Sequence, residues 1–172
     1  SGMVPAGLTR LEKLREVYLS KNELWSDLPP DIGLMEDLED IRVNENEMFG
    51  KIPESLYDLS KLKKLWLQDT LHCEQSEVDG WTCDVTSDHG FDGTISSGIG
   101  NLKKLSQLLL SNNPLSGELP SEIGNCEELA ILHMHKTNIE GSVPRELCLL
   151  RDKNLNNEMN EGIFYADCRP NN

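Results

Sequence analysis

The sequence has little positive charge, few aromatic side chains and no long apolar run. Lys and Arg number 16 against 30 Asp and Glu, so the formal net charge is −14. Nucleic acids and anionic lipid surfaces are bound by basic faces, and we therefore expect neither as a partner. No apolar run approaches the length that a membrane-spanning helix requires, so we expect no direct membrane insertion.

The sequence also lacks the patterns that accompany catalysis. It has no glycine-rich phosphate loop, and no serine or cysteine stands beside an evident general base. The glycines recur instead at the turns of the repeats. We therefore expect no enzymatic activity, no catalytic residue and no cofactor.

What the sequence does contain is a repeat. Pro5, Pro29 and Pro53 are equally spaced, and Pro120 and Pro144 lie the same interval apart. This period is about 24 residues, and the interval from Pro53 to Pro120 exceeds two periods by roughly 19 residues. Ser96, in Gly-Thr-Ile-Ser, stands where the missing proline is expected. The spacing predicts a large insertion, which we place at residues 71–92.

The segment from Leu105 to Pro120 shows the unit most clearly. Leu108 and Leu110 alternate as in a short strand, and Asn113 follows with a side chain that bonds the unpaired backbone of a tight turn. A strand this short cannot bury its apolar face alone and needs copies beside it. Self-similarity at this period is typical of a leucine-rich repeat solenoid.

The full pattern, Leu-x-x-Leu-x-x-Leu-x-Leu-x-x-Asn-x-Leu-x-Gly-x-Ile-Pro, resembles the plant-type leucine-rich repeat. This repeat occurs in the ectodomains of receptor-like kinases and in polygalacturonase-inhibitor-like proteins. The resemblance implies an α/β solenoid of about five 24-residue repeats. It also implies a concave parallel β-sheet, 3₁₀ or short helical turns on the convex side, and a C-terminal disulfide cap.

We expect a single domain over residues 1–172. Residues 145–172 resemble the plant-type C-terminal cap, whereas the chain opens inside a repeat, without the cysteine-paired N-terminal cap of this family. An uncapped first strand would expose its edge, so self-association through the N-terminal edge is one expectation.

The five cysteines are an odd number. Cys73 and Cys83 lie in the insertion, and Cys148 and Cys168 match the cap's cysteine framework, so the simplest pairing is Cys73–Cys83 and Cys148–Cys168. Cys126 occupies a position that is apolar in the other repeats, and we expect it to be a buried free thiol. Two disulfides favour an oxidising compartment, extracellular or at the cell surface. A protein with all its thiols reduced is the alternative.

Side chains between the strand leucines point to the concave face because strand side chains alternate. Stacking the repeats predicts a column that places Arg42 between two aromatic rings, and an arginine with aromatics is typical of interface hot spots. The candidate ligand-binding residues are Tyr18, Arg42, Trp66, Leu109, His133, His135, Asn44, Gln68 and Lys64. The alternative is that these cross-strand pairs only cover the sheet.

Two features raise the question of metals. His133 and His135 alternate on one strand, but the adjacent strand offers no third ligand beside them, so we expect no metal site there. The insertion is rich in carboxylates, yet their spacing matches no calcium loop, and calcium binding stays open.

The leading hypothesis is a non-catalytic module that binds a protein or peptide on its concave face. It would be the extracellular recognition domain, or a fragment, of a receptor-like protein. The alternatives are a secreted inhibitor of a hydrolase and a self-associating structural or adhesive repeat protein.

Overall fold

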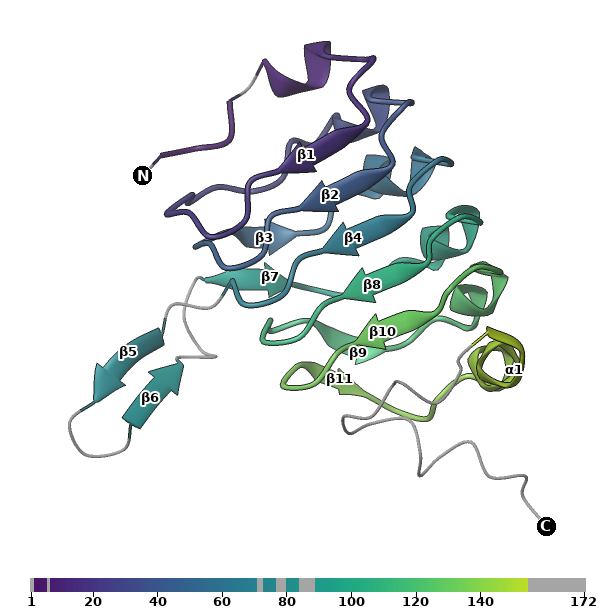
Figure 1. The fold of residues 1–172 in the computed structure, drawn as a ribbon. Coiled ribbons are helices and arrows are strands. Elements are labelled where there is room, and N and C mark those ends of the chain that lie inside the picture. The colour runs from purple at the N-terminus through teal and green to yellow at the C-terminus, as the bar shows by residue number, and fades with distance from the viewer. Residues whose placement is uncertain (1, 6, 71–72, 77–79, 84–88, 155–172) are drawn as a thin grey trace.

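The computed structural model describes residues 2–5, 7–70, 73–76, 80–83 and 89–154 (Figure 1). Its centre is a five-stranded parallel sheet with one strand from each repeat. In sheet order the strands are β1 Glu16–Tyr18, β2 Asp40–Arg42, β4 Lys64–Trp66, β8 Gln107–Leu109 and β10 Ile131–His133. Equivalent residues pair across every strand boundary, and the predicted solenoid sheet is confirmed.

The opposite side of each repeat carries a short helix. These are the 3₁₀ helices η1 Leu8–Arg10, η2 Ile32–Leu34, η3 Glu54–Asp58, η4 Ser97–Asn101 and η5 Ser121–Asn125, followed by the α-helix α1 Arg145–Asn154. Figure 1 shows these helices stacked in one row to the right of the five strands, and short 3₁₀ turns of this kind were predicted for the convex side. Between the sheet and the helices lies the core, where Leu65 and Leu108 are each 1% exposed.

Two smaller parallel sheets lie along the flank that joins the concave and convex sides. β3 Phe49–Lys51 pairs with β7 Gly90–Asp92, and β9 Ser116–Glu118 pairs with β11 Asn138–Glu140. The repeat pattern did not predict these pairs, which form because the chain runs extended from each asparagine turn to the following proline.

The predicted asparagine turns tie neighbouring repeats together. The Asn113 amide nitrogen donates to the carbonyls of Leu67, at 2.8 Å, and Leu110, at 3.0 Å, so that it bonds the preceding repeat as well as its own. Asn46 does the same with Leu19 and Val43, at 2.9 Å each. Because Asn113 is fully buried, its bonds replace water that cannot enter the turn.

The insertion begins as an antiparallel hairpin of β5 Cys73–Ser76 and β6 Gly80–Cys83. Figure 1 shows this hairpin standing apart from the five-stranded sheet. We placed the end of the insertion at residue 92, and this boundary needs correction. The repeat resumes at Gly90, because Phe91 is fully buried and occupies the core position that Leu115 fills in the next repeat.

The cysteines agree with their predicted positions as far as the structure describes them. Cys73 and Cys83 are direct partners in the hairpin register, where Cα atoms lie about 4.5 to 5.5 Å apart, within reach of a disulfide. Cys148 is disulfide-bonded, while Cys168 lies outside the described residues, so both pairings stay predictions. Cys126 is a buried free thiol, as predicted, and its Sγ donates to the Ile99 carbonyl at 3.2 Å.

Helix α1 covers the last repeat of the described chain. Leu147 and Leu150 are 2% and 6% exposed against η5, and the predicted cap beyond residue 154 lies outside the described residues. The fit is close: a Cβ added to Gly124 would lie 2.3 Å from the Cβ of Glu146. Among the residues that the structure describes, no helix has the length and hydropathy to cross a membrane.

Candidate functional site

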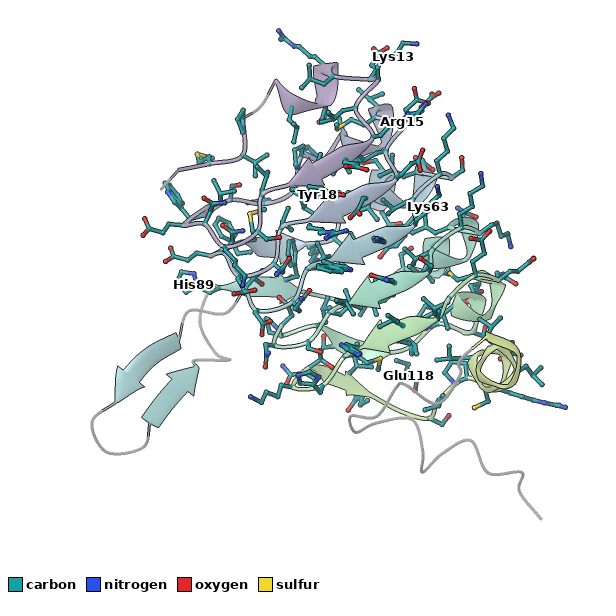
Figure 2. The ribbon with its side chains drawn as sticks, viewed as in Figure 1. Lys13, Arg15, Tyr18, Lys63, His89 and Glu118 are labelled. Atoms are coloured by element: carbon teal, nitrogen blue, oxygen red, sulfur yellow. The ribbon has the colours of Figure 1, made fainter. Side chains whose placement is uncertain are left out.

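The predicted concave residues form a continuous row, which we call the central column: Tyr18, Arg42, Trp66, Leu109 and His133. Each is the direct register partner of the next across the five strands. Tyr18 is 53% exposed and stands on the open face of the sheet in Figure 2, where Arg15 and Lys63 mark the entry to the strands. The column therefore lies on the concave face of the sheet.

Arg42 lies between two rings. Its guanidinium carbon is 4.6 Å from the centroid of the Tyr18 ring and 4.1 Å from that of Trp66, which are both cation–π distances. The predicted juxtaposition is confirmed, whereas a role in ligand binding stays a prediction. The Trp66 indole also donates to the Gln107 side chain at 3.1 Å, which orients the ring on the sheet.

Asp40 holds this cluster, and we did not single it out from the sequence. Its carboxylate accepts from Arg42 Nε at 2.9 Å and Nη2 at 2.7 Å, and from the Tyr18 hydroxyl at 3.2 Å. Lys64 Nζ lies 3.8 Å from the same carboxylate. Asp40 and Arg42 share a strand face at positions i and i+2, and this spacing is the signal that could have revealed the pair.

The hydrogen bonds to Asp40 determine how much of the Arg42 charge is available to a partner. The hydrogen bonds from its guanidinium to Asp40 raise the pKa of Arg42 above its ordinary value, so it stays charged. The Asp40 side chain is only 9% exposed, so the bidentate pair is largely shielded and its two charges offset each other locally. The cluster is therefore a rigid aromatic platform rather than a free cation.

A second predicted row, nearer the strand ends, is polar. The Ser20 hydroxyl donates to Asn44 at 2.6 Å, and Ser111 Oγ lies 2.9 Å from His135 Nδ1. Between these pairs lies Gln68, whose Oε1 is buried with no partner among the described residues. The row is thus mostly satisfied within itself.

The two predicted histidines, His133 and His135, lie close together near the end of β10. The His133 and His135 rings lie 6.4 Å apart. Within the described part of the chain, no group of three His, Cys, Asp or Glu side chains is close enough to hold a metal ion.

Comparisons with known proteins agree with this geometry. The family model described as Leucine Rich Repeat matches residues 13–35 and 104–126. The solved LRR ectodomain of the plant membrane receptor kinase GASSHO1/SCHENGEN3 from Arabidopsis thaliana has a TM-score of 0.73 at 26% identity, over 87% of this chain. The chain is a plant-type leucine-rich repeat protein. No curated protein matches its sequence.

Two further receptor structures resemble this leucine-rich repeat protein. The Arabidopsis receptor kinase HAESA, solved with the peptide hormone IDA and the co-receptor SERK1, matches 90% of the chain at 27% identity and a TM-score of 0.72. The ectodomain of the receptor kinase SOBIR1 from Arabidopsis thaliana matches 83% at 25% identity and a TM-score of 0.66. The chain spans 16% of the GASSHO1/SCHENGEN3 chain, 22% of the HAESA chain and 67% of the SOBIR1 chain.

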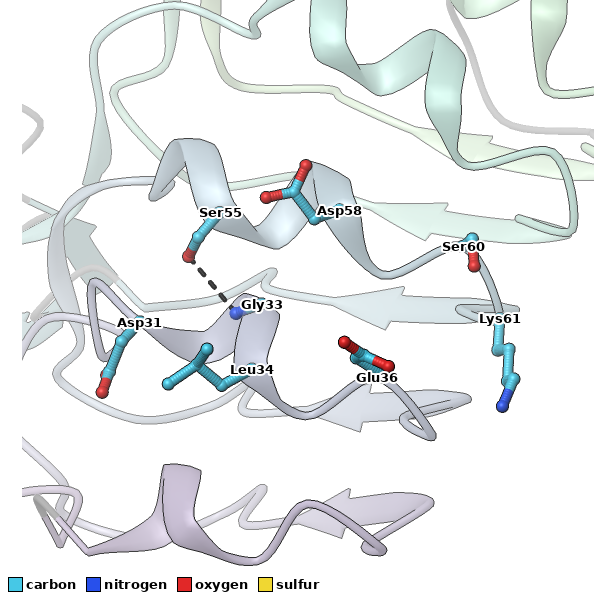
Figure 3. Close-up of a pocket in the computed structure, with 8 residues that line it drawn as sticks. All are labelled: Asp31, Gly33, Leu34, Glu36, Ser55, Asp58, Ser60 and Lys61. Atoms are coloured by element: carbon cyan, nitrogen blue, oxygen red, sulfur yellow. Dashed lines mark hydrogen bonds between the residues drawn. The ribbon is translucent and has the colours of Figure 1, made fainter.

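The convex side of the repeat protein carries a hollow of about 450 Å³ that we did not predict (Figure 3). It lies between η2 and η3 and is lined by Asp31, Gly33, Leu34, Glu36, Ser55, Asp58, Ser60 and Lys61. Ser55 spans it by accepting from the Gly33 backbone nitrogen at 3.3 Å. Asp31 accepts a hydrogen bond from Thr9, and Lys61 pairs with Asp37 outside the hollow. The hollow is thus a seam between repeats, with two of its charged groups already paired.

Proposed function

We propose that this leucine-rich repeat protein is a non-catalytic recognition module that binds a peptide or protein across the central column. The observation that carries the proposal is the Tyr18–Arg42–Trp66 stack held by Asp40. Aromatic and arginine side chains whose positions are already set lose little conformational entropy on binding, and such residues dominate measured interfaces. A row that only covered the sheet would not need a shared buried carboxylate.

The receptor structures support the same role. The HAESA structure contains a peptide hormone, and the GASSHO1/SCHENGEN3 structure is a complex with CASPARIAN STRIP INTEGRITY FACTOR 2. We accordingly propose that the chain is an extracellular part of a receptor-like protein. The disulfide-bonded Cys148 and the opposed Cys73 and Cys83 favour the oxidising compartment that this location requires.

Selection of binding peptides tests the proposal directly. The protein is panned against a phage-displayed library of random peptides, and the enriched peptides are synthesised and titrated by calorimetry. Trp66→Ala and Arg42→Ala should each weaken binding about tenfold or more, the loss expected for hot-spot residues. Leu34→Ala on the convex side is the matched control, since Leu34 is 59% exposed and distant from the column. Equal binding by all the variants would place the site elsewhere.

A second proposal is self-association through β1. It rests on Leu11, an apolar side chain that is 53% exposed in the segment between η1 and β1. Light scattering over a wide concentration range tests it. A mass that stays monomeric throughout would rule it out, whereas a Leu11→Glu variant should abolish any dimer.

A further inference from the structure

The concave face is divided in its charge, although the protein is strongly acidic overall. Among the described residues, the only outward carboxylates on the five strands are Glu16 on β1 and Asp40 on β2, and Asp40 is occupied by Arg42. The other three strands, with the residue two beyond each, present no carboxylate: Lys64, Trp66, Gln68, Gln107, Leu109, Ser111, Ile131, His133 and His135. In a chain of net charge −14, this half of the face is where an acidic ligand meets the least repulsion.

Apolar side chains form the floor of this half. Leu109 is the register partner of Trp66, and Ile131 is the register partner of Gln107 on the strand that follows. Trp66, Leu109 and Ile131 are each half-buried, so each leaves part of its apolar surface open. We call these three residues the apolar shelf. It offers an apolar side chain of a ligand a place to leave water.

Imidazoles stand at the far edge of the shelf. His133 is exposed and pairs in register with Leu109, while His135 is half-buried and bonded through Nδ1 to Ser111. Because Ser111 occupies Nδ1, a ligand would meet His135 at Nε2. An imidazole N–H donates to a carboxylate in the neutral form, and both ring nitrogens donate in the cation.

We propose that the ligand is an extended, acidic peptide segment that seats an apolar side chain on the shelf and a carboxylate at His133 and His135. The inference rests on the proposed function and adds the chemistry of the partner. His135 is one strand and about two residues from Leu109, which is about 8 Å for strands that lie about 4.8 Å apart. Successive side chains on one face of an extended peptide lie about 6.6 Å apart. The spacing therefore selects an apolar residue and an acid separated by one residue.

The overall negative charge does not prevent this. At physiological salt the Debye length is about 8 Å, so carboxylates on the convex side and the flank are largely screened from the shelf. Lys64, and Lys136 just beyond His135, add positive charge nearby. A basic peptide, drawn by the net charge alone, would find no free carboxylate on the three described strands of this half.

The test uses peptides enriched from the random library by the unmodified protein. The expected sequences share an apolar-x-acid pattern. Changing that acid to its amide should weaken binding at least fivefold to the unmodified protein but less than twofold to the His133→Ala/His135→Ala variant, because the two changes remove one interaction. Leu109→Glu should weaken binding about tenfold or more, while Leu34→Glu on the convex side should not change it.

The outcomes separate this inference from the proposed function. Amidating the C-terminus distinguishes a terminal carboxylate from a side-chain carboxylate. Basic or uncharged peptides that still depend on Trp66 would overturn the inference and leave the proposed function standing. A library that yields no peptide dependent on Trp66 or Leu109 would overturn both. If Leu109→Glu fails to fold, the same comparison with a single His133→Ala variant decides alone, since His133 is exposed and exposed substitutions change stability little.

Discussion

Replacing Asn113 by alanine should destabilise the protein far more than the same change at Asn22. The two residues occupy equivalent repeat positions, but Asn113 is fully buried and Asn22 is exposed. Among the described residues, the Asn22 side chain donates to two carbonyls of its own repeat, those of Leu19 and Ser20, and water can replace it there. We expect Asn22→Ala to cost about 0.5 kcal/mol or less, as for ordinary surface substitutions.

The loss of stability in Asn113→Ala follows from the buried polar groups that would lose their hydrogen-bond partners. Its amide oxygen accepts from the Phe91 backbone nitrogen at 2.8 Å and from the Thr70 hydroxyl, and its nitrogen donates to the Leu67 carbonyl at 2.8 Å. Alanine leaves the Phe91 N–H and the Leu67 carbonyl buried without these partners. Each unsatisfied buried group costs about 1 to 3 kcal/mol, so the two together cost about 2 to 6 kcal/mol.

Urea unfolding followed by tryptophan fluorescence measures both variants. With a denaturant slope of about 2 kcal/mol per M, Asn113→Ala should lower the midpoint by about 2 M, and Asn22→Ala should barely move it. The contacts at Asn113 join the strand that precedes the insertion to the chain that returns from it. Comparable small shifts for both variants would refute the reasoning, because they would mean that the buried turn recovers its hydrogen bonds without the amide.

Three further predictions concern packing, the free thiol and pH. Gly124→Ala should cost at least about 2 kcal/mol by forcing α1 away, whereas Gly7→Ala, which meets no atom within 4 Å, should be nearly neutral in the same unfolding assay. The Cys126 thiol, whose pKa burial raises to about 11, should resist a thiol reagent until the protein unfolds. The hydrogen bond from Lys61 lowers the pKa of the Asp37 carboxyl, so the ion pair stabilises the folded protein at neutral pH and this stabilisation disappears as the pH falls through the folded pKa of Asp37. In thermal melts, the melting temperature of Lys61→Met should therefore fall less on acidification than that of the unmodified protein.

Much of the fold follows from the period of the repeat. Because equivalent residues recur at a fixed spacing, aligning the repeats also aligns their strands, and the neighbours of Arg42 could be named in advance. The boundary of the insertion could not be predicted, because Phe91 is aromatic where the other repeats have leucine, methionine or isoleucine. Only its burial shows that it belongs to the core. Left-handed backbone at one position of every repeat was also hidden, because glycine never fills it: Lys21, Glu45, Asp69, Asn112 and Lys136 have φ between 52° and 59°.

The candidate site was predictable in its position but not in its chemistry. The alignment of the repeats determines which side chains are neighbours in the column. The rotamer of a long side chain depends in addition on which neighbouring groups it contacts. From the sequence, the Arg42 guanidinium could interact with a ligand, with the two neighbouring rings, or with Asp40 on its own strand. It takes the rings and Asp40 together, so its charge is offset before any ligand arrives. If a partner's carboxylate is recognised on this face, it must then be recognised beyond Trp66, where the histidines lie and the described strands β8 and β10 carry no acid of their own.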